Sequence, residues 1–168
     1  FTGLIRHIYF RYGEITNQLM VCLVSTKCKV WNIDVLVKDL VEKYPMISTV
    51  VLNINDKNTN VILGEENIML YGDGNIQDVL CGVKVTLSPH SFYQVNREGA
   101  ENLYTIAKNA LNLTKDDILL DLYCGAGTIG LSMAKKAKKI IGVEIIPEAI
   151  EDAKFNAKIN NIENAEFI

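Results

Sequence analysis

The sequence predicts an α/β chain built in two parts, and three observations support that prediction. The N-terminal part places one helical segment between β-branched, strand-like runs, which is typical of an α+β unit. The C-terminal part repeats strand, helix, strand and helix, and its strands are continuous apolar runs of the kind found in parallel sheets. Pro89 stands where the first pattern gives way to the second, so we expect one domain over residues 1–88 and another over 89–168.

The composition indicates a packed chain without a membrane span. Of 168 residues, 49% are hydrophobic and 22% are charged, a balance that supports an apolar core. The densest apolar run, Leu19 to Val24, is far shorter than the roughly 18 residues that a span requires. No signal peptide is visible and the four cysteines lack metal-ligand spacing, so we expect a reduced, cytoplasmic protein without a metal site. Phe1 at the first position indicates a piece of a longer protein.

The N-terminal part is expected to be an α+β unit with an antiparallel sheet. Asn32 is a suitable helix cap, and Pro45 stops the helix that follows it because proline cannot continue the hydrogen-bond ladder. The turn-rich residues 55–58 separate two further strands. The expected strands are residues 16–26, 48–53, 60–63 and 83–87.

The C-terminal part is expected to open a doubly wound α/β fold. Asn96 can cap a helix over residues 97–111, whose apolar residues recur at helical spacing. Two short apolar runs after this helix predict buried parallel strands. The expected elements are strands at 118–122 and 139–143, helices at 129–137 and 147–160, and the start of a third strand at 165–168.

The charge distribution bears on nucleic-acid binding. A net charge of −3 argues against a grip on nucleic acid by the chain as a whole. The first 31 residues are nevertheless basic, since they contain four cationic residues and a single acidic one, Glu14. Such cations could contact phosphates, or they could form an ordinary solvated face. The four candidates are Arg6, Arg11, Lys27 and Lys29.

A glycine loop follows the first strand of the C-terminal part. Gly125, Gly127 and Gly130 allow a sharp turn and let the backbone approach a ligand closely. Glu144 ends the next strand, where a carboxylate can accept hydrogen bonds from the two hydroxyls of a ribose. The spacing therefore predicts a site for the adenosine half of a cofactor.

The residues around the loop favour S-adenosyl-L-methionine as that cofactor. The three glycines also match a dinucleotide fingerprint, so a nicotinamide-dependent oxidoreductase is the rival reading. Asp121 precedes the loop, where a carboxylate disfavours two phosphates but attracts a sulfonium and an ammonium group. A helix also precedes the first strand, as methyltransferase domains commonly have it. A glycine turn that merely packs helix on strand remains a further alternative.

These motifs, in this order, resemble the RNA m5U methyltransferase family, which modifies uracil C5 in ribosomal or transfer RNA. The resemblance covers essentially the whole chain. It implies a central α+β domain followed by the first half of a class I, Rossmann-like methyltransferase domain that uses S-adenosyl-L-methionine. The motifs are Gly3-Leu4-Ile5-Arg6-His7, Gly13-Glu14, Ser91-Phe92-Tyr93-Gln94-Val95-Asn96, Asp121-Leu122-Tyr123-Cys124-Gly125-Ala126-Gly127-Thr128 and Val143-Glu144-Ile145.

The resemblance also implies roles for single residues. Gln94 would contact the cofactor, Tyr123 would line its pocket and Glu144 would hold the ribose. Thr128 stands where a loop donor could reach the methionine moiety. Simpler readings are that Gln94 satisfies backbone groups and that Tyr123 only packs. The full set of expected cofactor residues is Gln94, Asp121, Tyr123, Gly125, Gly127, Thr128 and Glu144.

The catalytic residues are expected beyond residue 168. The family adds a cysteine thiolate to uracil C6, and a base later removes the C5 proton. The motifs for that cysteine and base do not occur here, and Cys124 occupies a loop position without a catalytic role in the family. We therefore expect an inactive fragment of an RNA-modifying enzyme, acting on ribosomal RNA rather than transfer RNA. A methyltransferase for another substrate and a non-catalytic RNA-binding module remain alternatives.

Overall fold

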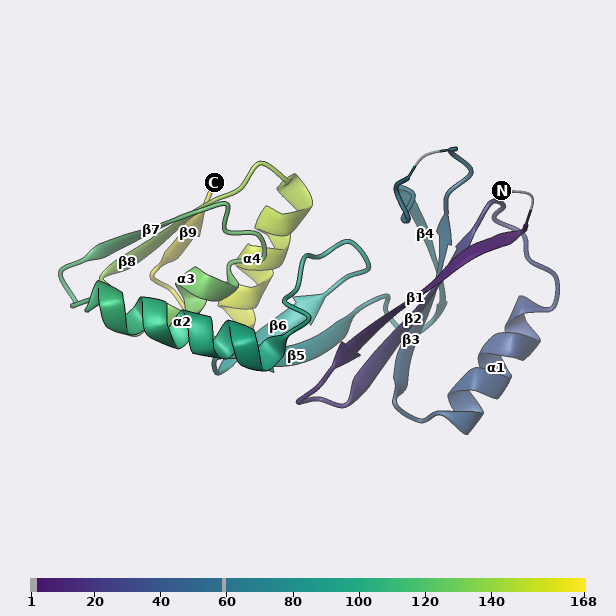
Figure 1. Ribbon diagram of the computed structural model, residues 1–168, viewed down its shortest axis with the longest axis horizontal. Coiled ribbons are helices and arrows are strands. Elements are labelled where there is room, and N and C mark those ends of the chain that lie inside the picture. The colour runs from purple at the N-terminus through teal and green to yellow at the C-terminus, as the bar shows by residue number, and fades with distance from the viewer. Residues whose placement is uncertain (1–2, 59) are drawn as a thin grey trace. The chain divides into compact units, whose positions relative to one another are not determined.

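The computed structural model describes residues 3–58 and 60–168, and the chain divides into two compact units (Figure 1). Unit 1 runs from the N-terminus to Gln77 and includes Ser88–His90, whereas unit 2 comprises Asp78–Leu87 and Ser91–Ile168. Phe1 lies outside the described residues. The sequence-based boundary after residue 88 differs from this division over residues 78–87 and stays a prediction. No helix in the described part of the chain is both long and apolar enough to cross a membrane.

Unit 1 contains a mixed four-stranded sheet, ordered β1-β2-β3-β4. β1 (Ile5–Gly13) pairs antiparallel with β2 (Gln18–Ser25), and β2 pairs parallel with β3 (Ile47–Ile54). β4 (Glu66–Tyr71) pairs antiparallel with β3. The prediction of an antiparallel sheet is therefore wrong for the central pair. Helix α1 (Ile33–Lys43) connects β2 to β3, and a crossover of this kind returns the chain in the same direction.

Helix α1 begins and ends where the sequence indicates, although its start lacks the expected capping bond. Asn32 precedes the helix with a left-handed backbone, φ +56°, and its side chain makes no capping hydrogen bond. The helix ends at Lys43, two residues before Pro45. Its buried residue, Val37, belongs to the main core of unit 1. The other buried members of that core are Val21, Leu23, Ile47, Val50 and Leu52.

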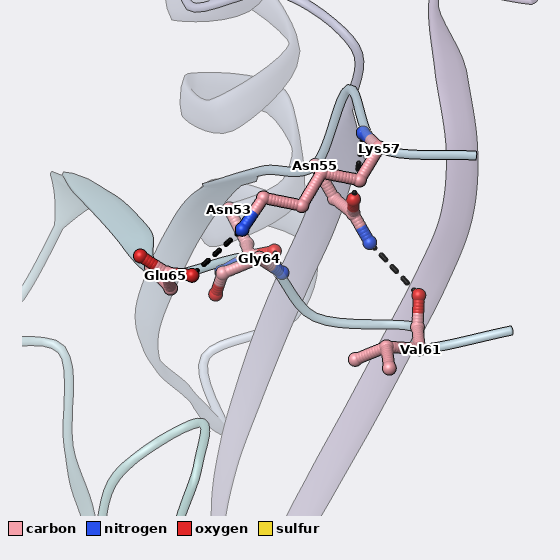
Figure 2. A network of polar contacts seen from close by, with 6 residues as sticks. All are labelled: Asn53, Asn55, Lys57, Val61, Gly64 and Glu65. Atoms are coloured by element: carbon pink, nitrogen blue, oxygen red, sulfur yellow. Dashed lines mark hydrogen bonds and ion pairs between the residues drawn. The ribbon is translucent and has the colours of Figure 1, made fainter. Parts of the chain in front are cut away.

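A loop between β3 and β4 is held by two buried asparagines (Figure 2). Asn53 donates to the carbonyl of Gly64 at 2.9 Å and accepts from its amide at 2.6 Å. Asn55 donates to the carbonyls of Val61 and Ile62 at 2.8 and 3.0 Å. The strand predicted over residues 60–63 is therefore wrong, because side-chain amides rather than a neighbouring strand bind these carbonyls.

Unit 2 contains a two-stranded hairpin and a three-stranded parallel sheet ordered β7-β8-β9 (Figure 1). The hairpin pairs β5 (Ile76–Leu80) with β6 (Val83–Leu87) through Cys81 and Gly82, which both have positive φ as tight hairpin turns require. The parallel strands and their helices confirm the predicted α/β class. The sheet and helix bounds are β7 Ile118–Leu122, β8 Lys139–Val143, β9 Ala165–Phe167, α2 Arg97–Leu111, α3 Thr128–Met133 and α4 Pro147–Ile159.

Two predictions for unit 2 need correction. Helix α3 ends at Met133 rather than at residue 137, because the chain then closes three-residue turns such as Lys136 N–H to Met133 C=O at 2.9 Å. Strand β7 is not buried on both faces. Its residues Ile118, Leu120 and Leu122 are 57%, 54% and 58% exposed, since the described residues cover only one side of this strand.

Helix α4 anchors β6 and the segment that follows it through three polar residues spaced one helical turn apart. Asn160 accepts from the backbone amide of Lys84 at 2.9 Å and donates to its carbonyl at 2.7 Å. Asn156 accepts from the amide of Thr86 at 2.9 Å. Asp152, one turn earlier, accepts from the hydroxyl of Ser91 at 2.7 Å. These bonds attach the hairpin and the start of the 91–96 segment to the helix beside the parallel sheet.

Candidate functional site

The glycine loop between β7 and α3 has an unusual backbone. Tyr123, Gly125 and Gly127 all have positive φ, at +59°, +53° and +76°. Glycine adopts this region freely, whereas a tyrosine there is uncommon. The amide of Cys124 donates to the carbonyl of Val143 at 3.0 Å, which fixes the loop against the end of β8. Tyr123 is left 88% exposed at the loop surface.

The three glycines of the loop serve different purposes. A Cβ at Gly127 would lie 2.9 Å from the ring of Phe167, and one at Gly130 would lie 2.8 Å from Ile140. These two glycines are required by packing within unit 2. At Gly125, no atom of the described residues comes within 4 Å of the position that a Cβ would take. Gly125 therefore faces open space, as expected where a ligand approaches the backbone.

Asp121, at the end of β7, connects that strand to α3. Its carboxylate accepts a hydrogen bond from the amide of Gly130 at 3.0 Å. Burial raises the pKa of Asp121 above its ordinary value, and the hydrogen bond from Gly130 opposes the rise. An ionised carboxylate accepts several hydrogen bonds, so Asp121 keeps capacity for a positively charged partner.

Glu144 links the loop to the start of α4. One carboxylate oxygen accepts from the amide of Gly125 at 3.1 Å. The other accepts from the amides of Ile145 and Ile146 at 2.8 and 3.1 Å. Three backbone bonds orient the carboxylate, and its two oxygens together offer about four acceptor sites. The remaining acceptor capacity lies beside Gly125, next to the open space at the loop.

Thr128 and Gln94 are brought together by a residue that sequence reasoning did not assign to the site. The hydroxyl of Thr128 lies 3.2 Å from the hydroxyl of Tyr104, which projects from α2. The side chain of Gln94 lies near the same tyrosine hydroxyl and opposes the rise of its pKa. In the sequence, Tyr104 is one of the apolar positions of an amphipathic helix. Its hydroxyl group was the only feature that could have indicated a role at the site.

The segment that contains Gln94 is fixed at several points. Tyr93 donates to the buried carboxylate of Asp78 at 2.8 Å. Asn96 caps α2 by accepting from the amide of Gly99 at 2.9 Å, as the sequence predicts. Phe92 keeps an exposed side chain in this segment. The segment thus holds Gln94 in place through its neighbours on both sides.

Cys124 has the properties of a structural cysteine. Its side chain is buried against the sheet, where a Cβ on Gly142 would contact its sulfur. Burial raises the pKa of the thiol to about 11, and the nearby carboxylates of Asp121 and Glu144 add to this rise. The thiol stays protonated at neutral pH, whereas a nucleophilic cysteine requires a thiolate.

Two of the four expected phosphate contacts are engaged within unit 1. Arg6 donates to the carbonyls of Asn55 and Lys57, both at 2.8 Å. Arg11 donates to the hydroxyl of Tyr9, and its guanidinium lies 5.5 Å from the centre of that ring. Both arginines therefore hold the fold of this unit. The other two candidates, Lys27 and Lys29, have exposed side chains.

Metal binding receives no support from the described part of the chain. Among residues 3–58 and 60–168, no three histidine, cysteine, aspartate or glutamate side chains form a group that could hold a metal ion.

Comparison with known proteins identifies related sequences. The sequence profile of the tRNA (uracil-5-)-methyltransferase family matches residues 58–168. An uncharacterised RNA methyltransferase of Streptococcus mutans is 44% identical over 99% of this chain, and one of Enterococcus faecalis is 45% identical over 99%. The chain spans only 37% and 36% of the length of these two relatives.

Solved structures show the same fold. The crystal structure of Pyrococcus abyssi tRNA (uracil-54, C5)-methyltransferase in complex with S-adenosyl-L-homocysteine superposes with a TM-score of 0.80 and is 28% identical, covering 99% of this chain and 39% of its own. The tRNA m1G37 methyltransferase of M. jannaschii, 23% identical with a TM-score of 0.56, covers 99% of this chain and 46% of its own and shows the fold alone. The chain belongs to the tRNA (uracil-5-)-methyltransferase family.

Proposed function

We propose that this chain provides the cofactor-binding part of an enzyme that methylates uracil C5 in RNA with S-adenosyl-L-methionine. The observation that carries the proposal is the open space at Gly125, with the carboxylates of Asp121 and Glu144 on the two strands beside the loop. A cofactor with cationic groups and a ribose needs acceptors of this kind at a close backbone approach.

The chemistry of the donor set fits this cofactor. Glu144 is oriented by three backbone amides and retains acceptor capacity for the ribose hydroxyls. Asp121 supplies negative charge for a sulfonium or an ammonium group. Tyr123 presents an exposed ring at the loop, as a pocket-lining role for the adenine requires.

The same residues disfavour the nicotinamide alternative. A pyrophosphate at the loop would meet the carboxylate of Asp121, and like charges at short range repel strongly when partly buried. Tyr123, Gly125, Gly127 and the ribose-binding Glu144 suit either cofactor, so Asp121 decides between them. We therefore retain S-adenosyl-L-methionine and reject a dinucleotide.

Within this chain, the proposed role is to bind and orient the cofactor. When bound, the cofactor supplies the methyl group. Burial raises the pKa of Cys22 and of Cys124 to about 11, so neither thiol is activated for attack on uracil. We expect the nucleophilic cysteine and the base in a part of the enzyme outside residues 3–168.

The RNA substrate is proposed from the relatives. The bacterial proteins at 44% and 45% identity are named RNA methyltransferases, and the P. abyssi enzyme acts on uracil 54 of transfer RNA. We propose RNA as the substrate class, with ribosomal RNA and transfer RNA as the two candidates. Exposed Lys27 and Lys29 are the proposed phosphate contacts in this chain.

A methylation assay tests the proposal. Full-length protein is incubated with S-adenosyl-L-methionine and, separately, with unmodified ribosomal and transfer RNA transcripts, and nucleosides are analysed by mass spectrometry. We expect 5-methyluridine to accumulate in one RNA class, and none to form when S-adenosyl-L-methionine is left out. Methylation of another base or of C5 in neither RNA would contradict the proposal.

A further inference from the structure

Tyr104 combines a buried ring with one polar contact. The residue lies on α2 and is 4% exposed. Its ring belongs to an apolar cluster with Leu80 and Ala100, against which Tyr93 also packs. This packing fixes where the ring lies and therefore where its hydroxyl is placed. A buried hydroxyl requires a hydrogen-bond partner, because leaving it without one costs free energy of folding.

The partner of that hydroxyl is Thr128, the first residue of α3. The two hydroxyl oxygens lie 3.2 Å apart. Thr128 directly follows Gly127, so it stands at the point where the glycine loop becomes helix. A threonine in a helix has two accessible rotamers for its hydroxyl, and an external partner selects one of them.

The hydroxyl of Tyr104 stays protonated at neutral pH, since burial raises its pKa above the ordinary value. It therefore has one hydrogen to donate and lone pairs to accept with. Gln94 lies near the same hydroxyl and opposes the rise of its pKa, so two of the expected cofactor residues are neighbours of Tyr104.

We propose that Tyr104 is a positioning residue: its buried hydroxyl holds the Thr128 side chain in the rotamer that the cofactor meets. The inference rests on the proposed function, because it takes Thr128 to contact S-adenosyl-L-methionine. Tyr104 acts through Thr128 and does not itself touch the cofactor. A phenylalanine ring would pack in the core equally well, so the positioning of Thr128 depends on the hydroxyl group of Tyr104.

The experiment uses full-length protein and compares Tyr104→Phe, Thr128→Val, Thr128→Ser and the double variant Tyr104→Phe/Thr128→Val. Calorimetry gives the Kd for S-adenosyl-L-homocysteine, and thermal unfolding without ligand gives Tm. We expect Tyr104→Phe to raise the Kd about three- to tenfold, the size of one hydrogen bond. Thr128→Ser keeps the hydroxyl and should bind within about twofold of wild type. Tyr12→Phe, which removes the hydroxyl that bonds Asn17 at 2.8 Å in unit 1, is the matched control.

The double variant tests whether Tyr104 acts through Thr128. On a Thr128→Val background, Tyr104→Phe should raise the Kd no further, because the partner of its hydroxyl is already gone. Additive effects on the Kd would overturn the proposal. An unchanged Kd in Tyr104→Phe would also overturn it, even if Tm falls, because the hydroxyl would then contribute only to stability. If Tyr104→Phe does not fold, equal binding by Thr128→Val and Thr128→Ser overturns it.

Steady-state kinetics give an independent readout. Tyr104→Phe should raise KM for S-adenosyl-L-methionine while kcat stays close to wild type, and a fall in kcat alone would contradict a positioning role in binding. Failure of wild-type protein to bind S-adenosyl-L-homocysteine would instead reject the proposed function. The two failures are therefore distinguishable.

Discussion

Unit 1 and unit 2 each hold a loop at the end of a strand by side-chain bonds to backbone groups, but they use different chemistry. In unit 1, Asn53 and Asn55 lie on either side of Ile54 at the end of β3 and bind the loop before β4 (Figure 2). In unit 2, Asp121 and Glu144 end β7 and β8 and bind the glycine loop and the helix starts beside it.

The difference lies in charge and exposure. Asn53 and Asn55 are 0% and 3% exposed, and their amide donors and acceptors are used on the loop itself. Asp121 and Glu144 are only half-buried and carry ionisable groups with acceptor capacity left. A neutral, buried amide closes a loop for structural purposes, whereas a half-buried carboxylate can hold a loop and also bind a ligand.

The largest expected effect comes from breaking the closed loop of unit 1. Asn53→Ala leaves the backbone groups of Gly64 and the side chain of Asn67 without their partner. We expect the free energy of unfolding to fall by about 3 kcal/mol, since several buried polar groups lose their bonds. Urea denaturation measures the change, and Asn58→Ala at an exposed position is the control. A loss no greater than that of the control would contradict the structural role of Asn53.

Next comes the packed glycine of unit 2. Gly127→Ala combines a positive φ of +76° with a Cβ placed 2.9 Å from Phe167. We expect a loss of about 2 kcal/mol in the free energy of unfolding, from backbone strain together with overpacking. Thermal and urea unfolding measure it. A variant as stable as wild type would show that Phe167 moves aside and that packing does not require this glycine.

Gly125→Ala is the counterpart of Gly127→Ala, because its Cβ enters open space rather than a packed core. The strain of φ +53° costs about 1 kcal/mol of stability, less than at Gly127. The affinity for S-adenosyl-L-homocysteine should nevertheless fall by at least about tenfold, because a methyl group occupies the space of the close approach. Calorimetry on both alanine variants separates the two effects. Unchanged affinity in Gly125→Ala would place the cofactor elsewhere.

The smallest expected effect is the pH dependence of Asp121→Asn. Burial raises the pKa of Asp121 in the folded state, so ionisation of this group opposes folding. Protonated Asp121 favours the folded state, and the wild type loses this stabilisation as pH rises through the raised pKa. The asparagine variant does not titrate and shows no such loss. We therefore expect the variant to gain stability relative to wild type from acid to neutral pH, and none below the ordinary aspartate range. Urea unfolding at several pH values measures this, and a gain confined to acid pH would contradict it.

Unit 2 was the more predictable of the two units. Helix α2 and strands β7 and β8 begin and end at the predicted residues, because each combines a cap or a turn with an uninterrupted local pattern. In unit 1, strands β1 and β4 were not predicted, and in unit 2 strand β5 was not. β4 lies at the edge of its sheet, where its residues are half-buried or exposed, and its apolar run is only four residues long, from Ile68 to Tyr71.

The missed features depend on contacts between residues far apart in the chain. The parallel pairing of β2 with β3 is an exception, because the predicted helix between the two strands already indicated a crossover connection. Tyr104 reaches Thr128 across 24 positions, and Asn53 reaches Gly64 across 11. In the sequence, a tyrosine on an apolar helix face and an asparagine in a strand give no indication of such partners. The expected roles of Gln94, Tyr123 and Thr128 stay predictions until a ligand is measured.

The most direct test of the account is a calorimetric titration of full-length protein with S-adenosyl-L-homocysteine and, separately, with NADH, repeated with Glu144→Ala. The account predicts that S-adenosyl-L-homocysteine binds, that NADH does not, and that removal of the carboxylate weakens binding by about tenfold or more. Preference for NADH, or equal binding of S-adenosyl-L-homocysteine by wild type and Glu144→Ala, would contradict it.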